Sequence, residues 1–271
     1  MLSSLLASMP SVERIRVIPS LLLSGDGLVK TVRFQKPVYV GDPINTVKIF
    51  NEKEVDEIAV LDIGATRNGR EPNFEKIAEI AGECFMPMAY GGGITSVAQM
   101  RRILLSGVEK VILNSIVFRQ PQLIRAAADQ FGSQSVVVSI DAKPGWFGRY
   151  QTRSHGGTVR HSVDPVTAAV EAVRQGAGEI LLNSVDRDGT YLGYDTDLLR
   201  KVTSAVCVPV IACGGARNVQ DFVAAVRDGG AAAVAAGSMF VFHGVHKAVL
   251  VNFPSETILR EQFFQVCRQR S

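Results

Sequence analysis

The sequence predicts a single (β/α)8 barrel, an α/β fold of the TIM-barrel type with two-fold half-barrel pseudo-symmetry. Three observations support this prediction. The chain has 271 residues, of which 46% are hydrophobic, and this suffices for the core of one barrel domain. Short apolar runs alternate with stretches of helical periodicity, as in βα units that form a parallel sheet. Glycine motifs also repeat at a constant spacing in the two halves of the chain.

The expected strands are short runs of β-branched or apolar residues, typical of strands that are buried on both faces of a parallel sheet. In chain order they cover 16–22, 57–63, 86–90, 110–114, 136–141, 179–185, 208–212 and 232–236. Helices are expected between these strands, where apolar residues recur with helical period. They cover 73–84, 97–106, 123–131, 165–175, 196–205 and 219–228. Eight such units favour a closed barrel, so we expect one domain over 1–271 with a short N-terminal extension at about 1–14.

The half-barrel repeat is visible in the glycine turns. The sequence YGGG at 90–93 and the sequence CGGA at 213–216 lie 123 positions apart, and Asn-Ser at 114–115 and Gly-Ser at 237–238 have the same separation. Thr95 and Asn218, which are suitable helix N-caps, also match at this offset. Two half-barrels of four βα units each account for the repeat.

The composition excludes several classes of function. The net charge is +3 without a concentrated basic run, so the chain lacks the pattern of a nucleic-acid-binding protein. The four cysteines and four histidines lack the spacing of zinc ligands, and the cysteines suggest no disulfide framework. We therefore expect no metal, no cofactor and a reducing, cytoplasmic environment.

Membrane insertion and secretion are not expected either. Residues 229–246 contain no charged residue, but a Gly-Ser break and two histidines favour a buried strand followed by a turn. The N-terminal sequence has no basic lead before its apolar stretch, so it is a poor signal peptide.

Each half contains two turns that are suited to bind a phosphate. Glycines between a strand and a helix expose backbone N–H groups at the helix N-terminus, where an anion is stabilised. In each half a second turn of small residues follows one βα unit later, as in barrel phosphate pockets. Two pockets across the mouth suit a substrate with a phosphate at each end; the alternative is that these turns only connect elements. The turns contain Gly92, Gly93, Asn114 and Ser115 in the first half and Gly214, Gly215, Gly237 and Ser238 in the second.

Carboxylates follow several of the expected strands. Asp141 ends the fifth strand, Asp62 lies near the end of the second, and Asp186 and Asp188 follow the sixth. Side chains at these ends can point into the barrel mouth, where they can transfer protons. The alternative is that they cap helices or pair with basic loop residues, which is as plausible for Asp186. The long loop at 142–164, which includes Trp146 and Phe147, is expected to be a mobile lid, a substrate-contacting segment or an ordinary surface loop.

From about residue 16 onward the sequence resembles the cyclase subunit family (HisF) of imidazole glycerol phosphate synthase. The segments AYGGGIT, FGSQSVVVSIDAK, GAGEILLNSVDRDGTYLGYDT and VIACGGARN carry the resemblance. It implies that the barrel takes ammonia from a partner glutaminase and uses it to cleave and cyclise a bisphosphorylated ribulosyl aminoimidazole intermediate. It makes Asp141 a candidate general acid/base. It also assigns substrate or phosphate contacts to Lys30, Asp62, Gly92, Gly93, Asn114, Ser115, Asp188, Gly214, Gly215, Gly237 and Ser238.

A second set of charged residues stands at the strand starts. They are Arg16, Glu57, Lys110 and Glu179. Strand starts meet water at the bottom of a barrel, so a single charge there would mean little. Two cations and two anions can instead form a ring in which burial is tolerated through pairing. In the family that the sequence resembles, the matching residues form the gate through which ammonia enters.

One position departs from that family. Superposing 18–22 on 137–141 places Leu22 on Asp141, where the family carries a second catalytic aspartate. Loss of one acid/base group typically costs about two to four orders of magnitude in rate. Asp26 lies nearby, in a loop from which it is not assumed to substitute. The segments RVIPSLLLSGDGLVKTVRF and VGDPINTVKIFNEKEVDEIAVLDI look more like the glycosyl amidation-associated, WbuZ-like paralogues, which accompany a HisH-like glutaminase and a sugar amidotransferase in surface-polysaccharide synthesis.

The sequence therefore leaves three functions open. The first is a synthase subunit that forms a heterodimer with a HisH-like glutaminase and serves the amidation of a surface-polysaccharide (lipopolysaccharide) sugar. The second is the cyclase subunit of histidine biosynthesis. The third is a non-catalytic partner that activates a glutaminase and conducts ammonia. A phosphorylated small molecule is the expected ligand in the first two.

Overall fold

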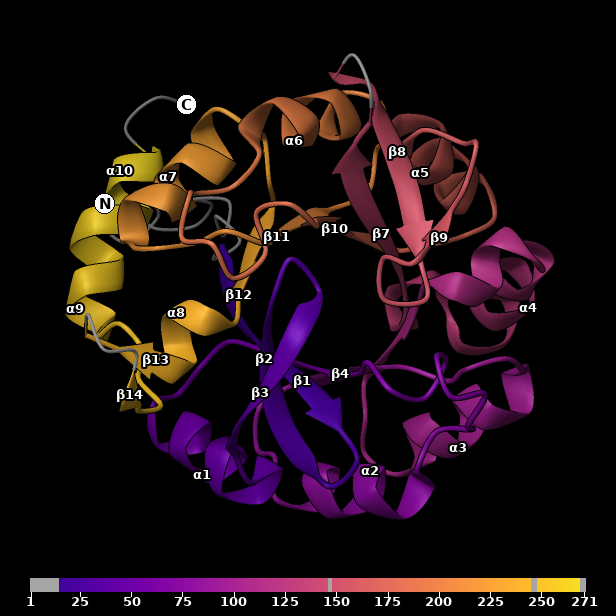
Figure 1. Cartoon of the computed structure of the whole chain (residues 1–271), viewed down its shortest axis with the longest axis horizontal. Helices are drawn as coiled ribbons and strands as arrows, with labels where there is room; N and C mark the ends of the chain where they lie inside the picture. Colours follow the sequence, from indigo (N-terminus) through magenta and orange to yellow (C-terminus); the bar gives the residue numbers. More distant parts are fainter. Residues whose placement is uncertain (1–14, 146–147, 245–247, 269–271) are drawn as a thin grey trace, which may run out of the picture.

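Eight parallel strands close into a barrel in this computed structural model, which describes residues 15–145, 148–244 and 248–268. The strands pair in the order β10-β11-β12-β1-β4-β5-β6-β7, and β7 pairs with β10 to close the ring. Figure 1 views the ring of strands within an outer ring of helices. The barrel strands are β1 (Arg16–Ser24), β4 (Ile58–Asp62), β5 (Met88–Gly91), β6 (Lys110–Leu113), β7 (Val136–Pro144), β10 (Glu179–Ser184), β11 (Val210–Cys213) and β12 (Ala233–Ala236). The predicted (β/α)8 fold class is confirmed. The expected extension at about 1–14 lies outside the described residues.

Helices connect the strands on the outside of the barrel. They are α1 (Pro43–Glu52), α2 (Phe74–Gly82), α3 (Val97–Leu105), α4 (Gln122–Phe131), α5 (Pro165–Arg174), α6 (Thr196–Thr203), α7 (Val219–Arg227) and α8 (Ser238–Val241), with α9 (Glu256–Leu259), a π-helix (Arg260–Phe264) and α10 (Gln265–Arg268) after the barrel. All six predicted helices are present. Helix α1 was not predicted, although Asp42, whose carboxylate accepts from Asn45 N–H, and Pro43 form an N-terminal signal.

One helix cap differs from the sequence prediction, and another agrees with it. The cap of α3 is Ser96 rather than Thr95, because the Ser96 hydroxyl accepts from Gln99 N–H while the Gln99 side chain accepts from Thr95. Asn218 caps α7 as predicted, in a reciprocal pair with Asp221. The segment 229–244 forms β12, the short helix α8 and the short strand β13 (Phe242–His243), and among the described residues no helix has the length and apolarity that crossing a bilayer requires.

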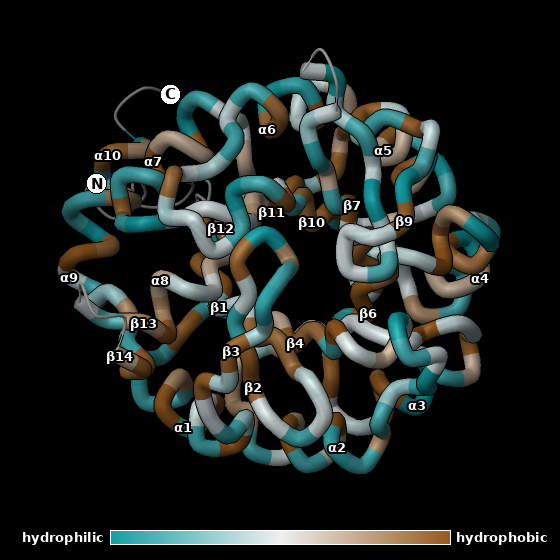
Figure 2. The backbone as a smooth tube through the Cα atoms, viewed as in Figure 1, coloured by the Kyte–Doolittle hydropathy of each residue, from teal (hydrophilic) through white to brown (hydrophobic). Residues whose placement is uncertain are grey.

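The core has two layers. The larger layer lies between the strands and the surrounding helices, and includes Phe50, Tyr90, Phe222 and Phe240 at zero exposure. The smaller layer fills the barrel interior, where apolar side chains of strands on opposite sides meet. Figure 2 shows the strands as mostly hydrophobic segments inside a more hydrophilic rim. Several interior residues are small, namely Ala59, Ala89, Ala233 and Ala235.

Two β-excursions extend from the mouth of the barrel. After β1, the strands β2 (Gly27–Val32) and β3 (Gln35–Gly41) form an antiparallel hairpin that lies in front of the mouth in Figure 1. After β7, the strands β8 (Tyr150–Ser154) and β9 (Val159–Arg160) fold back antiparallel. The segment that was expected as a loop is therefore largely a ribbon. Trp146 and Phe147 lie outside the described residues.

Strand register agrees with the half-barrel superposition. Leu22 lies opposite Leu61 in the β1–β4 pair, and Asp141 lies opposite Asn183 in the β7–β10 pair. The positions two residues earlier, Ser20 and Ser139, likewise occupy equivalent registers. Leu22 and Asp141 therefore stand at the same height in the two halves.

Candidate active site

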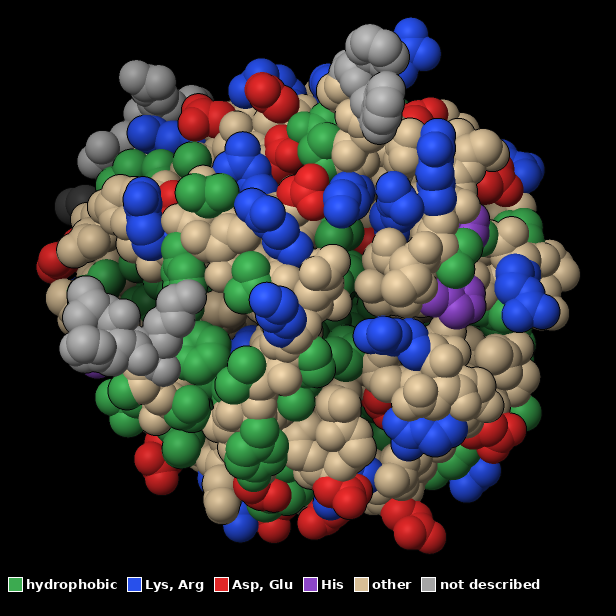
Figure 3. Space-filling model, in the orientation of Figure 1, with side chains coloured by type: hydrophobic (Ala, Val, Ile, Leu, Met, Phe, Trp, Pro, Cys, Tyr) green, Lys and Arg blue, Asp and Glu red, His purple; other side chains and the backbone are tan. Residues whose placement is uncertain are grey.

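The mouth of the barrel contains a cavity of about 200 Å³ at the C-terminal ends of the strands. This is where (β/α)8 barrels carry their active sites. The cavity brings together Asp141 and all the predicted substrate or phosphate contacts, which are Lys30, Asp62, Gly92, Gly93, Asn114, Ser115, Asp188, Gly214, Gly215, Gly237 and Ser238. In Figure 3, Lys and Arg side chains gather around the centre of the face that the view shows. Arg67 and Arg119 are among the cavity residues, so its rim suits an anion.

The first phosphate-type turn is formed by Gly92 and Gly93 after β5 and by Asn114 and Ser115 after β6. Gly93 has φ +71°, and a Cβ there would lie 2.7 Å from the Arg70 carbonyl oxygen, so only glycine fits without a shift. Ser115 begins a 3₁₀ turn, Ser115–Phe118. Its hydroxyl donates to Asn114 Oδ1 at 3.1 Å and accepts from a backbone N–H of the β8–β9 turn.

The second turn repeats this arrangement after β11 and β12. Gly215 has φ +109°, and a Cβ there would overlap the Gly193 carbonyl oxygen. Gly237 and Ser238 follow β12 and lead into α8. A Cβ at Gly237 would overlap the Lys30 amine, so this glycine makes room for the lysine. The two turns lie in opposite halves of one cavity, as the sequence repeat predicts.

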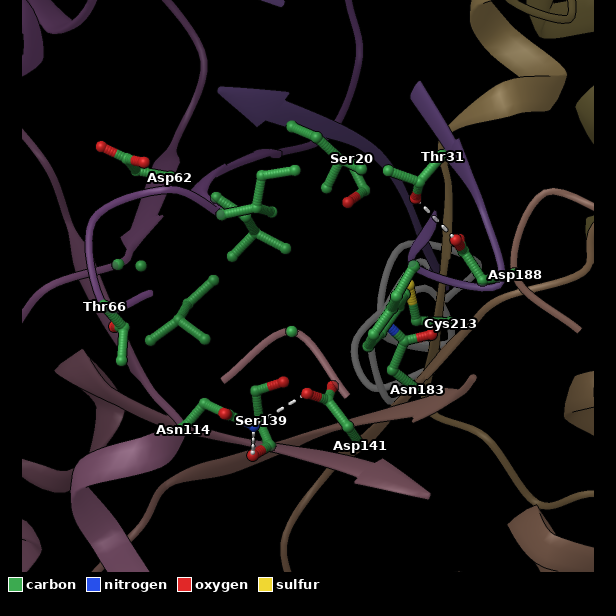
Figure 4. Close-up of a pocket in the computed structure, with 18 of the residues that line it drawn as sticks. Ser20, Thr31, Asp62, Thr66, Asn114, Ser139, Asp141, Asn183, Asp188 and Cys213 are labelled. Atoms are coloured by element: carbon green, nitrogen blue, oxygen red, sulfur yellow. Dashed lines mark hydrogen bonds between the residues drawn. The ribbon is translucent and has the colours of Figure 1, made fainter. Parts of the chain in front are cut away.

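Asp141 is a cavity carboxylate whose pKa lies far above its ordinary value. Its side chain is buried, and burial raises its pKa to about 7, against the hydrogen bond from Asn114 and with support from the nearby negative charge of Asp188. Asn114 Nδ2 bridges Asp141 Oδ2 at 3.2 Å and the Ser139 carbonyl at 2.9 Å (Figure 4). A carboxyl group that titrates near neutral pH can both accept and donate a proton.

Lys30 reaches the cavity from the β2–β3 hairpin. Its Nζ donates to the Ser20 carbonyl oxygen at 2.5 Å, and the side chain is 5% exposed. Burial lowers its pKa to about 8, although the charge of Asp188 opposes this effect. Asp188 accepts a hydrogen bond from Thr31 at 3.0 Å, and burial raises its pKa. The cavity therefore holds one amine, Lys30, and two carboxyl groups, Asp141 and Asp188, whose pKa values are shifted by burial.

Two of the remaining carboxylates, Asp62 and Asp186, have structural partners. Asp62 Oδ1 accepts from the backbone N–H groups of Gly64 and Ala65, both at 2.9 Å, and its side chain points away from the other labelled groups in Figure 4. Asp186 lies 3.4 Å from Lys143, the pairing that was considered as its alternative role. Asp26 is exposed in the β1–β2 turn and is not among the cavity residues.

The four charged strand-start residues form one ring at the other end of the barrel. Arg16 contacts Glu57 at 2.5 Å and Glu179 at 2.8 Å, and Lys110 contacts the same two carboxylates at 2.9 and 3.2 Å. The side chains are between 4% and 25% exposed. Each cation touches both anions, so no charge in this largely buried ring lacks a partner.

Several cavity residues were missed from the sequence. Asn183 faces Asp141 across the β7–β10 pair, and its Oδ1 has no hydrogen-bond partner among the described residues. His155 lines the cavity; its N–H donates to Ser115, and its Nδ1 lies 2.9 Å from the Ser154 hydroxyl, which also contacts His161 at 2.8 Å. The β8–β9 turn belongs to the long loop for which a substrate-contacting segment was one of three expectations, and it supplies His155 and Gly156 to the cavity. The signal available for Asn183 was a polar residue near the end of the expected strand 179–185.

A (β/α)8 barrel with its cavity at the strand ends is the class that fold and site define. Comparison with known families is more specific: residues 16–246 match the family described as "Histidine biosynthesis protein". The chain is 53% identical over 241 residues to the Pseudomonas aeruginosa protein named "Putative imidazole glycerol phosphate synthase subunit hisF2", covering 89% of this chain and 96% of the relative.

Other relatives agree with this result. The chain is 47% identical to a Leptospira borgpetersenii protein named "Putative imidazole glycerol phosphate synthase subunit HisF", over 90% of this chain and 96% of the relative. It is 49% identical to the Vibrio vulnificus "Putative imidazole glycerol phosphate synthase subunit hisF3", over 89% and 94%. The chain belongs to the histidine biosynthesis protein family and is a HisF-like barrel.

Proposed function

We propose that this chain is the synthase subunit of a glutamine amidotransferase complex, which receives ammonia from a HisH-like glutaminase and delivers it to a phosphorylated substrate at the mouth. The ring of Arg16, Glu57, Lys110 and Glu179 is the observation that carries this proposal. A ring of four largely buried charges at the barrel bottom adds little net stability, because desolvation offsets the ion pairs. A role as the entrance for ammonia explains why the ring lies at the bottom of the barrel.

The barrel interior supports the same direction of transfer. Between the ring and the mouth the interior is apolar, and small side chains such as Ala59, Ala89, Ala233 and Ala235 contribute to it. Burying an ammonium ion in such surroundings is far more costly than burying neutral ammonia. Ammonia that passes the ring would arrive beside Asp141 in the cavity, and this carboxylate can take a proton from the nitrogen once it has attacked the substrate and become positively charged.

The substitution at Leu22 favours a specialised paralogue. A cyclase that uses two opposed strand-end carboxylates would lose one of them here, because Leu22 stands at the height of Asp141. We infer that the chain serves amidation of a surface-polysaccharide sugar, together with a sugar amidotransferase, as in the WbuZ-like group. The retained Asp141 and both phosphate-type turns favour the histidine-pathway cyclase as the second candidate. A non-catalytic glutaminase activator is the third, and Leu22 is the observation that favours it.

Glutamine hydrolysis by the partner glutaminase tests the complex. Adding this chain should stimulate hydrolysis, and Glu179→Gln, which removes one charge from the ring, should reduce the stimulation or uncouple it from nitrogen transfer. Glu171→Gln is the matched control, because Glu171 forms an exposed ion pair with Arg174 at 2.7 Å on the outer surface. No response of the glutaminase to the wild-type chain would contradict the proposal.

Two further experiments separate the candidates. Restored growth of a histidine auxotroph that lacks its own cyclase subunit would favour the histidine pathway over the polysaccharide role. Formation of imidazole glycerol phosphate from the bisphosphate intermediate and ammonium salt would do the same in vitro. Glutaminase stimulation without any turnover at the mouth is the result expected for the non-catalytic partner.

A further inference from the structure

The two half-sites place different nitrogen donors at equivalent positions. Each half-site joins the turn after one strand to the next strand of the ring. In the first half-site, Asn114 Nδ2 after β6 donates to the Ser139 carbonyl and to Asp141 of β7. In the second half-site, which joins β12 to β1, Gly237 occupies the place of Asn114, and the Lys30 amine fills the space that this glycine leaves. Lys30 Nζ donates to the Ser20 carbonyl, which is equivalent to that of Ser139. The lysine therefore takes the place of the asparagine amide.

The carboxylate that would complete the second half-site is missing. Asp141 accepts the second hydrogen bond of Asn114, whereas the equivalent side chain, Leu22, cannot accept one. Among the described residues, the Ser20 carbonyl is the one hydrogen-bond acceptor of the Lys30 amine. An aspartate at position 22 would raise the pKa of the lysine and keep it charged. Leucine supplies no negative charge and adds apolar surface, and both effects favour the uncharged amine.

An amine in these surroundings is suited to nucleophilic chemistry. Burial lowers the pKa of Lys30 to about 8, although the nearby charge of Asp188 opposes the effect, so about a tenth of the amine is uncharged at pH 7 and about half at pH 8. Lysines that are desolvated in this way form Schiff bases with carbonyl substrates. Lys30 also lines the same cavity as the second phosphate-type turn, which positions a phosphorylated ligand next to it.

We propose that Lys30 forms an imine with the carbonyl carbon of a phosphorylated open-chain sugar bound in the mouth, and that ammonia then displaces the lysine. This inference rests on the proposed function and adds to that site a covalent role for Lys30, which requires a phosphorylated aldehyde or ketone as the substrate. The Lys30 nitrogen attacks the carbonyl carbon, and a proton moves from nitrogen to oxygen to give a carbinolamine. Loss of water gives the imine. Ammonia adds to the imine carbon, and cleavage of the bond to Lys30 returns the free amine and leaves the substrate as its own imine. No oxidant or reductant is required.

Asp188 is placed to move the protons of this sequence. It interacts with the charge of Lys30, and burial raises the pKa of its carboxyl group. Thr31, the residue after Lys30, donates to Asp188 at 3.0 Å and fixes its orientation. A carboxyl group in this state can take the proton that the attacking nitrogen loses and return it to the departing water.

Labelling with pyridoxal 5′-phosphate, which carries both a phosphate and an aldehyde, tests the inference on the full chain. After borohydride reduction, peptide mass spectrometry should find the adduct on Lys30, and inorganic phosphate should protect this residue. The exposed Lys53 serves as the internal reference and should not be protected. From pH 7 to pH 9 the labelling rate of Lys30 should rise roughly tenfold and level off, whereas an ordinary amine with a pKa of about 10.4 rises roughly 100-fold.

The variant Leu22→Asp tests the cause, because a carboxylate there should keep the lysine protonated. We expect Lys30 labelling at pH 7.5 to fall at least about eightfold relative to Lys53, which corresponds to a pKa raised by about one unit or more. If that variant does not fold, phosphate protection and the pH profile of the wild-type chain still decide the question. Labelling that spares Lys30, or that phosphate does not prevent, would overturn the inference. If phosphate binds but Lys30 is not labelled, the imine inference fails and the proposed function is unaffected. If Lys30 is labelled but the glutaminase does not respond, the proposed function fails and the reactivity of Lys30 stands.

Discussion

Removal of one anion from the charged ring should destabilise the barrel by an amount that its geometry allows us to estimate. Glu57 Oε2 accepts from Arg16 at 2.5 Å and from Lys110 at 2.9 Å, and its side chain is 4% exposed. Glu57→Gln preserves the shape but leaves two cations with Glu179 as their one remaining anion in the ring. Breaking a buried pair from one side costs about 3–5 kcal/mol. Because both cations are partly exposed, we expect the lower end, about 3 kcal/mol.

This loss should lower the melting temperature by roughly 6–12 °C, since about 1 kcal/mol corresponds to roughly 2–4 °C in a chain of this size. Thermal unfolding followed by circular dichroism at pH 7 measures the shift. The control Glu171→Gln removes an exposed ion pair and should change stability by less than about 1 kcal/mol. If the melting temperature of Glu57→Gln lies within the range of this control, the ion pairs of Glu57 stabilise the fold less than their distances imply.

Two other substitutions have effects that the structure predicts. Asp141→Asn should stabilise the chain at pH 8 but not at pH 4, which thermal melts at both pH values would check. The native state retains the Asp141 proton up to about pH 7, whereas the unfolded chain releases it near pH 4. The buried carboxyl group therefore destabilises the fold increasingly from about pH 4 to pH 7 and fully at pH 8. Equal gains at both pH values would contradict this reasoning. Tyr194→Phe removes a buried hydroxyl that donates to the Ala235 carbonyl at 2.9 Å and should cost about 1 kcal/mol in urea unfolding; an unchanged midpoint would show that this bond adds nothing.

The barrel strands could be predicted because both of their faces are buried. A strand such as β10 (Glu179–Ser184) is apolar throughout most of its length, and periodicity alone finds it. The β2–β3 hairpin lacks such a pattern, since β3 is mostly exposed and carries Val38 and Tyr39 on its surface. Its pairing depends on β1, which precedes it, and on a backbone bond from Arg33 to Asp188. Long-range contacts of this kind leave no local signal.

In the candidate site, too, the residues that follow barrel strands could be predicted, and those on the β-excursions could not. The glycine turns and Asp141 stand directly after barrel strands, so their position at the mouth follows from the strand prediction. Thr31 and His155 reach the cavity on excursions whose folding depends on tertiary pairing. The environment of Lys30 was also beyond prediction, because it depends on Ser20 and Leu22 of β1 and on Gly237 after β12, which tertiary pairing brings together around this β2 side chain.

Phosphate binding tests most directly whether the mouth consists of two half-sites. Titration calorimetry with inorganic phosphate should find two sites per wild-type chain. Gly93→Ala and Gly215→Ala each force a side chain against backbone and should each remove one site and retain the other. Gly69→Ala, at φ +63° but in open space, is the control for backbone strain and should retain both. Binding of no phosphate by the wild-type chain, or loss of both sites in a single turn variant, would contradict the account.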